Sequence, residues 1–235
     1  FVWAFFATFT NYIAGMIVAL MINKKGIKLK KLWRTVFVLT IAIPQFVTLM
    51  LMRRLLDDNG PLNAQLKAWG WIEQSIRFLS TKNNARLTVI LVNMWVGVPY
   101  TMLVTSGILM NIPGDLYESA RIDGASPFTQ FWKITLPYML FVTGPYLITT
   151  FIGNINNFNV IFFLTGGGPA NTLTGGLFGD TDLLVTWLYS LTVGGARQEY
   201  AIGSALGIII FVISAFISLV MYSRTAASQR EDEFQ

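Results

Sequence analysis

The sequence predicts an all-α, polytopic transmembrane domain with about five spans over residues 1–235. Of the 235 residues, 54% are hydrophobic and only 12% are charged, and the mean hydropathy is positive. Apolar runs, about as long as the hydrocarbon core of a bilayer requires, alternate with short polar segments. Long apolar runs of this kind predict helices, because a helix satisfies all of its backbone hydrogen bonds within lipid.

Residue types that the chain lacks exclude several classes of function. It contains no Cys and no His, which removes disulfide frameworks, thiol chemistry, the usual zinc sites and catalytic triads. The formal charge of +5 could suggest nucleic acid, but the basic residues gather beside the apolar runs. We therefore expect no catalytic residue, no metal, no cofactor and no nucleic-acid partner, and we expect membrane lipid around the chain.

The first expected span covers residues 1–22. The sequence begins inside this apolar run, without Met and without a basic leader, so we expect that upstream residues are missing. A short segment dense in Lys and Arg follows at residues 23–34. Loops of this kind stay in the cytoplasm, and the segment fixes the predicted orientation. The alternative is a nucleic-acid patch, which is disfavoured because the run is short and lies between two spans.

The second expected span covers residues 35–56, and Pro44 interrupts it. Proline removes a backbone hydrogen bond and bends a helix. An external loop follows, with an amphipathic patch that includes Trp69 and Trp71. The third expected span covers residues 87–110 and returns the chain to the cytoplasmic side.

A polar segment at residues 111–137 separates the third and fourth spans. Pro113 suits the first turn of a helix, and Asp115 and Glu118 complement its positive N-terminal end. Gly124 can adopt the left-handed conformation that ends a helix. The pattern predicts one short helix of about ten residues.

A second short helix begins at Ser126, which suits an N-cap, and Leu136 and Pro137 are expected to close the unit. The fourth span is expected at residues 138–164. An external loop at residues 165–198 follows, in which Asp182 is expected to cap a surface helix.

The fifth span is expected at residues 200–222, where small residues favour close packing between helices. The remaining residues, 223–235, are polar and form the expected cytoplasmic tail.

The polar segment resembles the "EAA" loop of the membrane subunits of binding-protein-dependent ABC importers. The resemblance rests on Glu118, Ala120 and Gly124, followed after a fixed interval by residues 134–137. It implies a type I ABC importer permease fold, in which this loop is the cytoplasmic coupling helix that sits in a cleft of an ATPase subunit. The positions that it assigns to ATPase coupling are Leu116, Glu118, Ala120, Ile122, Gly124, Leu136 and Pro137.

Two stripes of polar or small residues stand out within the apolar spans, each at helical spacing. They are Asn93, Gly97 and Tyr100 in the third span and Thr150, Asn154 and Asn157 in the fourth. Polar side chains at mid-bilayer depth are costly and mark substrate pathways by default. The two spans are antiparallel and the stripes lie at similar depth, so we expect them to face one another. Amides and a tyrosine suit a neutral, hydroxyl-rich ligand such as a sugar. Packing between helices is the alternative role.

The same spans resemble the maltose and maltodextrin permease branch of this family. By that resemblance, the sugar-lining positions are Asn93, Val96, Gly97, Tyr100, Thr150, Gly153 and Asn154. The resemblance also implies the partners, namely a second homologous permease, two ATP-binding subunits and an extracytoplasmic sugar-binding protein. It implies the cytoplasmic membrane of a prokaryote as the location.

The sequence thus predicts a permease subunit that carries a sugar, maltose or maltodextrin before other disaccharides or oligosaccharides, and that has no ATPase site of its own. Its glycine triplet at residues 166–168 is not followed by the Lys and Ser or Thr of a phosphate-binding loop. An intramembrane enzyme is disfavoured, because the spans contain no metal cluster, Ser/His pair or carboxylate pair. A passive channel or scaffold is the remaining alternative.

Overall fold

The computed structural model describes residues 1–24, 26–194 and 198–223. Within these ranges all regular structure is helical, and the β contact found there is an isolated bridge between Ala170 and Gly179. Four segments in the described ranges are long and apolar enough to cross a membrane, namely α1 (Val2–Asn23), α5 (Lys82–Asn111), the run Pro127–Ile155 and α11 (Tyr200–Ser223). The predicted all-α, polytopic fold is confirmed.

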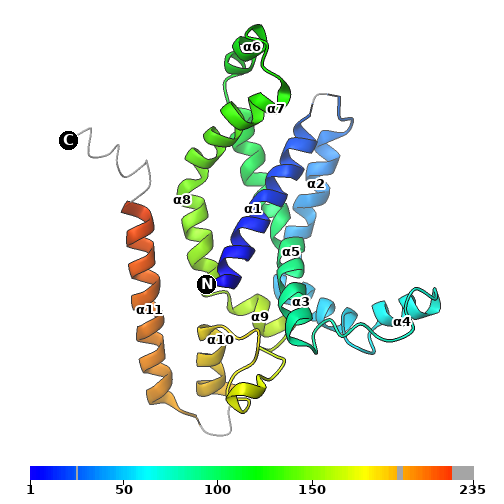
Figure 1. The fold of residues 1–235 in the computed structure, drawn as a ribbon, viewed down its shortest axis with the longest axis vertical. Coiled ribbons are helices and arrows are strands. Elements are labelled where there is room, and N and C mark those ends of the chain that lie inside the picture. The colour runs from blue at the N-terminus through cyan, green and yellow to red at the C-terminus, as the bar shows by residue number, and fades with distance from the viewer. Residues whose placement is uncertain (25, 195–197, 224–235) are drawn as a thin grey trace.

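Helix α1 lies between α5 and α8 (Leu136–Ile155) in the bundle (Figure 1). On the α8 side, Tyr12 and Met139 share a buried apolar cluster. On the α5 side, a Cβ atom on Gly15 would lie only 2.6 Å from Cβ of Thr101. The two helices therefore pack backbone to backbone, in the manner that small residues permit within membranes.

The second span is broken rather than bent. Helix α2 (Lys30–Ile41) ends before Pro44, and α3 (Gln45–Leu55) leaves it at an angle of 85°. Proline explains the break, because it has no N–H to continue the helix. The direction of α3 comes from tertiary packing, since Leu49 is fully buried in a cluster with residues of α5 and α9 (Phe158–Leu164). The interruption predicted at Pro44 is therefore present, but it is a break of 85° rather than a bend within one helix.

The segment that enters the fourth span is one long helical run. Helix α7 (Pro127–Gln130), a π-helical turn at Phe131–Thr135 and α8 follow one another without a break. The sequence predicted that Leu136 and Pro137 close the polar unit, but the helical run continues through both residues. Pro137 has no N–H for the backbone hydrogen bond of a regular helix. The wider π-helical turn just before it lets the helix continue without that bond.

The fourth span ends earlier than expected. Helix α8 stops at Ile155, and Asn157 begins α9 by accepting a hydrogen bond from the backbone N–H of Val160 at 3.2 Å. Asparagine is a strong N-cap residue, because its side chain replaces a missing backbone partner. The predicted end at residue 164 is therefore wrong, and α9 is a separate short helix.

Residues 165–194 fold into a lobe at the end of the bundle opposite α6 (Figure 1), called the external lobe after its predicted side, which contains a short 3-10 turn (Thr172–Thr174), α10 (Leu184–Tyr189) and a π-helical turn (Ser190–Gly194). Asp182 does not cap α10 as expected, because Leu183 occupies the N-cap position. The Asp182 carboxylate instead accepts hydrogen bonds from the Gly179 N–H at 2.7 Å and the Thr186 hydroxyl at 2.8 Å. Asp182 thereby joins the loop at Gly179 to the first turn of α10. The expected loop at 165–198 includes residues 195–197, which lie outside the described residues.

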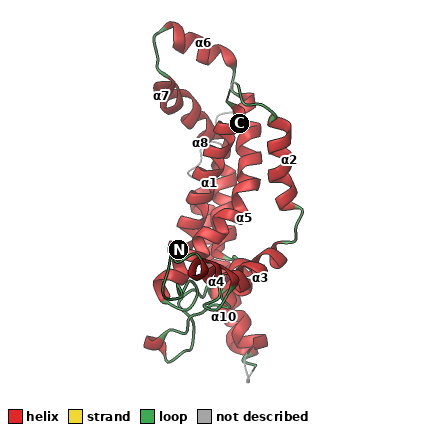
Figure 2. Cartoon of the chain, turned by 90° about the vertical axis from the view of Figure 1, so that its right-hand side faces the viewer, coloured by secondary structure: helices red, strands yellow, loops and turns green. Residues whose placement is uncertain are grey.

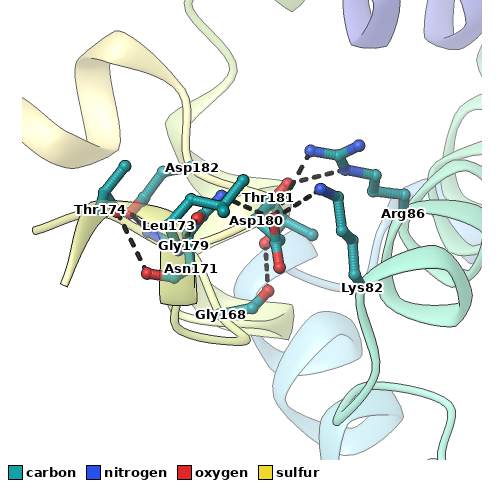
Figure 3. Close-up of polar contacts among 10 residues, drawn as sticks. All are labelled: Lys82, Arg86, Gly168, Asn171, Leu173, Thr174, Gly179, Asp180, Thr181 and Asp182. Carbon is teal, nitrogen blue, oxygen red and sulfur yellow. Dashed lines mark hydrogen bonds and ion pairs between the residues drawn. The ribbon is translucent and has the colours of Figure 1, made fainter. Parts of the chain in front are cut away.

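Asp180 fastens the external lobe to the start of α5 (Figure 3). Its carboxylate lies 3.6 Å from Lys82 Nζ and 3.7 Å from Arg86 Nη2. Asn171 donates a further hydrogen bond to the same oxygen at 3.0 Å, and Arg86 Nε donates to the Asp180 carbonyl at 2.9 Å. The lobe and the outer end of α5 are thus joined by several charged contacts.

Two elements remain at the ends of the bundle. Helix α4 (Pro61–Ala68) extends sideways from α3, while α6 (Gly114–Ile122) projects beyond the opposite end (Figures 1 and 2). Helix α11 packs on α8, where Asn156 donates to the Ser214 hydroxyl at 3.1 Å. The expected cytoplasmic tail lies outside the described residues from residue 224 onward.

Candidate functional site

The first candidate site is the projecting unit formed by α6 and α7. Helix α6 has no buried residue and carries Asp115 in its first turn and Arg121 in its last. Both charges complement the helix dipole. Pro113 is the N-cap residue rather than the first residue of the helix. The helix spans nine residues, so the predicted short helix is present.

A tight corner joins α6 to α7. Gly124 has φ +77°, and the Ala125 N–H donates to the Ala120 carbonyl at 2.8 Å, which closes α6. Ser126 accepts from the backbone N–H of Thr129 at 3.2 Å and caps α7 as predicted. The Tyr117 and Thr135 hydroxyls, 2.8 Å apart, tie α6 back to the long helical run. The unit is therefore well ordered by its own contacts.

Apolar side chains on this unit face outward. Leu116 is 46% exposed and Ile122 is 86% exposed, and Phe128 and Trp132 on the neighbouring run are also exposed. Glu118 lies on the same exposed helix. Leu136 and Pro137 lie at the base of the unit, where α8 begins. An exposed, well-ordered apolar surface rimmed by charges is typical of a protein-binding surface.

The second candidate site is a set of polar and small residues on α1 and on the helices that flank it, called the polar seam. It comprises Thr8, Asn11, Asn93, Gly97 and Asn154. Asn154 of α8 is buried and donates to the Thr8 hydroxyl of α1 at 3.0 Å. Its side-chain oxygen accepts from Asn157 at 3.1 Å, and its backbone carbonyl accepts from the Trp3 indole at 2.9 Å. These contacts connect the two helices near their outer ends.

Asn93 and Gly97 of α5 also face α1. A Cβ atom on Gly97 would lie 2.4 Å from the Asn11 amide nitrogen, so only glycine leaves room for that side chain. Asn93 Nδ2 and Asn11 Oδ1 are buried, and neither has a hydrogen-bond partner among the described residues. Buried polar atoms without partners are rare in native proteins and call for an explanation. A donor and an acceptor are thus available along this seam.

The two polar stripes face one another in part: Tyr100 of α5 lies beside Tyr146 of α8, with ring centroids 6.3 Å apart, whereas Asn154 contacts α1 instead. Helix α1 lies between α5 and α8 and contributes Thr8 and Asn11 to the seam. Sequence reasoning missed these two residues, although Thr8, Asn11 and Gly15 recur at helical spacing within an apolar run. This helical periodicity in the first span is the sequence signal that identifies Thr8 and Asn11.

Val96 and Tyr100 lie on a different side of α5. They line a cavity of about 620 Å³ between α5 and the break after α2. The break contributes the polar side chains of Thr40, Gln45 and Thr48. The break at Pro44 was the available signal for these lining residues, since polar residues beside an interrupted span line a cavity more often than they face lipid.

The remaining predicted positions lie on α8. Thr150 is half-buried, while Gly153 is exposed and a Cβ atom there would meet nothing within 4 Å. The seven predicted sugar positions therefore divide into three environments: the α1 seam (Asn93, Gly97, Asn154), the α2–α3 cavity (Val96, Tyr100) and a more open face of α8 (Thr150, Gly153).

A family model described as "binding-protein-dependent transport system inner membrane component" matches residues 11–228. The chain belongs to this family. The match includes α5, α6, α8 and α11, so it covers the projecting unit and all of the seam except Thr8, which precedes residue 11.

Relatives within the family include sugar permeases. The galactooligosaccharides transport system permease protein GanP of Bacillus subtilis (strain 168) is 38% identical over 98% of this chain. The maltodextrin transport system permease protein MdxF of the same organism is 34% identical over 98% of it. This chain spans about half of each relative, 54% in both cases.

A solved structure has the same helical arrangement. A chain in the crystal structure of a bacterial alginate ABC transporter, in complex with an alginate pentasaccharide-bound periplasmic protein, superposes with a TM-score of 0.77 at 26% identity. The match covers 95% of this chain and 75% of that one. The expected ABC importer permease fold is therefore confirmed.

Proposed function

We propose that this chain is part of the membrane-spanning permease of an ATP-driven ABC importer for a neutral oligosaccharide. The observation that carries the proposal is the continuity of the projecting unit with the polar seam. Helix α5 leads directly into α6, and α7 leads directly into α8. Helices α5 and α8, which contribute Asn93 and Asn154, are therefore the two helices that hold the projecting unit.

This continuity supports a mechanical role for the unit. An ATPase subunit that binds Leu116, Glu118 and Ile122 of α6 would displace the ends of α5 and α8 when it closes on ATP. Ala120 and Gly124 allow the close approach and the tight corner, and Leu136 and Pro137 transmit the movement at the base of α8. The chain then switches between outward-open and inward-open states, and ATP is hydrolysed on the partner subunits.

Polar groups without partners support a hydroxyl-rich substrate. The unpaired donor on Asn93 and the unpaired acceptor on Asn11 are buried in this structure, so sugar hydroxyls would satisfy them in a state in which α1 and α5 have moved apart. The cavity beside Tyr100 adds amide, hydroxyl and aromatic surface, and among the described residues that line it none is Asp, Glu, Lys or Arg. An uncharged sugar fits this chemistry better than an acidic one.

Within this class we propose maltose or maltodextrin, with a galactooligosaccharide as the second candidate. The resemblance of the third and fourth spans to maltodextrin permeases favours the first. The identity of 38% to GanP, against 34% to MdxF, favours the second. Both substrates are neutral and rich in hydroxyls, so they place the same demands on the seam.

The proposed assembly contains a second homologous permease, two ATP-binding subunits and an external sugar-binding protein, in the cytoplasmic membrane of a prokaryote. The basic segment after α1 lies at the same end of the bundle as α6 (Figure 1). The positive-inside rule places that end in the cytoplasm, where ATP is available.

Uptake of labelled sugars by cells that express the complete transporter tests the proposal. We expect accumulation of labelled maltodextrin that stops when ATP is depleted, with labelled galactooligosaccharide as the paired substrate. Accumulation of only the galactooligosaccharide would change the substrate and leave the importer intact. Entry that continues without ATP would replace the importer with a passive channel.

A further inference from the structure

Residues 57–81, between α3 and α5, form a projecting finger that contains α4 and carries an exposed pair of tryptophans (Figure 1). Trp69 and Trp71 have ring centroids 5.1 Å apart, and their exposed fractions are 58% and 72%. They lie at the end of α4, away from every helix that is long enough to span a membrane. Large apolar side chains on the spans have lipid as their expected neighbour, but this pair needs a separate explanation.

The finger is rigidly built from its base. Asn63 is 1% exposed and donates to the carbonyls of Asp57 and Ile76, at 3.2 and 2.9 Å. The Asn63 oxygen accepts from the Ile76 N–H at 2.9 Å, so one side chain fastens the outgoing and returning segments of the finger together. Leu62 and Phe78 pack against the buried cluster that contains Leu49. The finger is therefore an extension of the folded bundle.

The end of α4 fixes the tryptophan pair. Gly70 has φ +71°, a conformation that favours glycine, and the Trp71 N–H donates to the Leu66 carbonyl at 3.0 Å. This turn folds Trp71 back beside Trp69. The paired exposure of the two rings is thus a consequence of the backbone and is not an accident of side-chain rotation.

The position of the finger favours a lipid surface as its partner. Helix α3 leaves α2 at 85°, and α4 continues outward from α3 at the level where α1, α5 and α8 end, away from α6 (Figure 1). The finger therefore extends sideways, along the plane of a membrane that surrounds the bundle. A partner that approaches from the external solution would come along the spans instead.

The side chains also match that location. Tryptophan is enriched at membrane–water boundaries, where its apolar rings sit among the headgroups and its N–H remains hydrogen-bonded. Lys67 is exposed on the other side of α4, where it can reach lipid phosphate. We propose that the finger, with Trp69 and Trp71 at its end, anchors the chain in the headgroup region of the outer leaflet.

A nitroxide label tests this proposal directly, because residues 1–235 contain no cysteine and any cysteine elsewhere in the transporter can be replaced by serine beforehand. We would introduce Trp71→Cys into the complete transporter, label it, and reconstitute the complex into phosphatidylcholine–phosphatidylglycerol nanodiscs. Collision with oxygen, which concentrates in lipid, is then compared with collision with a water-soluble nickel chelate. Ala64→Cys is the matched control, because Ala64 is exposed and lies five residues before Trp69, on the opposite side of α4.

We expect the label at position 71 to favour oxygen and the label at position 64 to favour nickel. A preference for nickel at both positions would overturn the proposal, because the finger would then lie in water. Poor access to both reagents at position 71 would also overturn it, since a protein partner would then cover the tryptophans.

Native fluorescence gives a second readout without a new cysteine. Brominated lipids quench tryptophans that touch them, and a Trp69→Phe/Trp71→Phe variant keeps the apolar surface while removing both fluorophores. We expect the absolute emission lost in brominated lipid, per mole of transporter, to be smaller in this variant than in the parent. An equal loss in the two proteins would show that neither ring contacts lipid.

Discussion

Arg86 and Asp180 form a two-point contact between α5 and the external lobe. The Arg86 guanidinium donates to the Asp180 carbonyl at 2.9 Å, and its Nη2 lies 3.7 Å from the Asp180 carboxylate. The Asp180 side chain is only 8% exposed, while that of Arg86 is 52% exposed. The aspartate is therefore the buried partner, and the lobe depends on it more than on either cation.

Asp180→Asn should loosen the external lobe. The amide carries no charge to pair with Lys82 and Arg86, and although both cations are about half exposed, Asp180 itself is nearly buried, so its loss should matter more than loss of a fully exposed pair. We expect faster amide hydrogen exchange in residues 165–183 and no change in α6. Glu73→Gln, an exposed carboxylate of the α4 finger, is the control. Equal exchange in Asp180→Asn and the parent would mean that apolar packing alone holds the lobe.

Gly15→Ala should separate α1 from α5. The added Cβ would lie 2.6 Å from Thr101 Cβ and 3.0 Å from the Met102 backbone nitrogen, so the helices must move apart. Overpacking of this kind costs about 1–3 kcal/mol, which should lower the melting temperature in detergent. Gly107→Ala is the control, because a Cβ atom there meets nothing within 4 Å. Equal melting temperatures for the two variants would contradict the close contact.

Arg34 joins three helices at the end of the bundle that leads into α6. Its Nη2 donates to Asn23 Oδ1 and to Ser106 Oγ, each at 2.8 Å. Arg34→Met should leave Asn23 Oδ1 without its donor, at a cost of about 1–3 kcal/mol, while Ser106 Oγ still accepts from Asn23 Nδ2. We expect a lower melting temperature and faster exchange near the end of α5. Lys31→Met, at an exposed position one turn earlier, should change neither quantity. Equal melting temperatures for Arg34→Met and Lys31→Met would show that the hydrogen bonds of Arg34 do not stabilise the bundle.

Variants of Thr8 and Asn154 can distinguish a role in helix packing from a role in transport. Their contact spans 3.0 Å between α8 and α1, and such bonds contribute about 0.6 kcal/mol on average within membranes. Thr8→Val should therefore lower the melting temperature slightly, and Asn154→Leu somewhat more, because it also removes the acceptor of the Asn157 side chain. Only Asn154→Leu should abolish sugar uptake while the complex still assembles. Equal uptake in the two variants would reduce Asn154 to a packing residue.

The sequence predicts the local features of this fold well. Apolar length determines the long helices, and Ser126 and Gly124 mark the corner between α6 and α7 where the structure has it. These features depend on residues close together in the chain, such as a cap and the N–H that it binds. The position of the exposed unit between α5 and α8 is therefore predictable from the residues within it.

Features that depend on distant contacts are harder to predict. Pro44 predicts a bend, but the angle of 85° comes from burial of Leu49 against α9. Likewise, the spacing of Asn93 and Asn154 is correct for two helix faces, yet it does not reveal that α1 lies between them. Which helix occupies that space is decided by packing of small residues such as Gly15, and a single helix face does not encode it.

Binding of an ATPase subunit by α6 is the central claim, and Glu118→Lys tests it most directly. The complete chain, purified gently from its native membrane, should bring down an ATPase, and the Glu118→Lys variant should lose it. Glu73→Lys makes the same charge reversal at an exposed position on the external side and should keep the ATPase. Retention of the ATPase by Glu118→Lys at the parent level, or its absence from the parent, would contradict the assignment of α6 as the coupling helix.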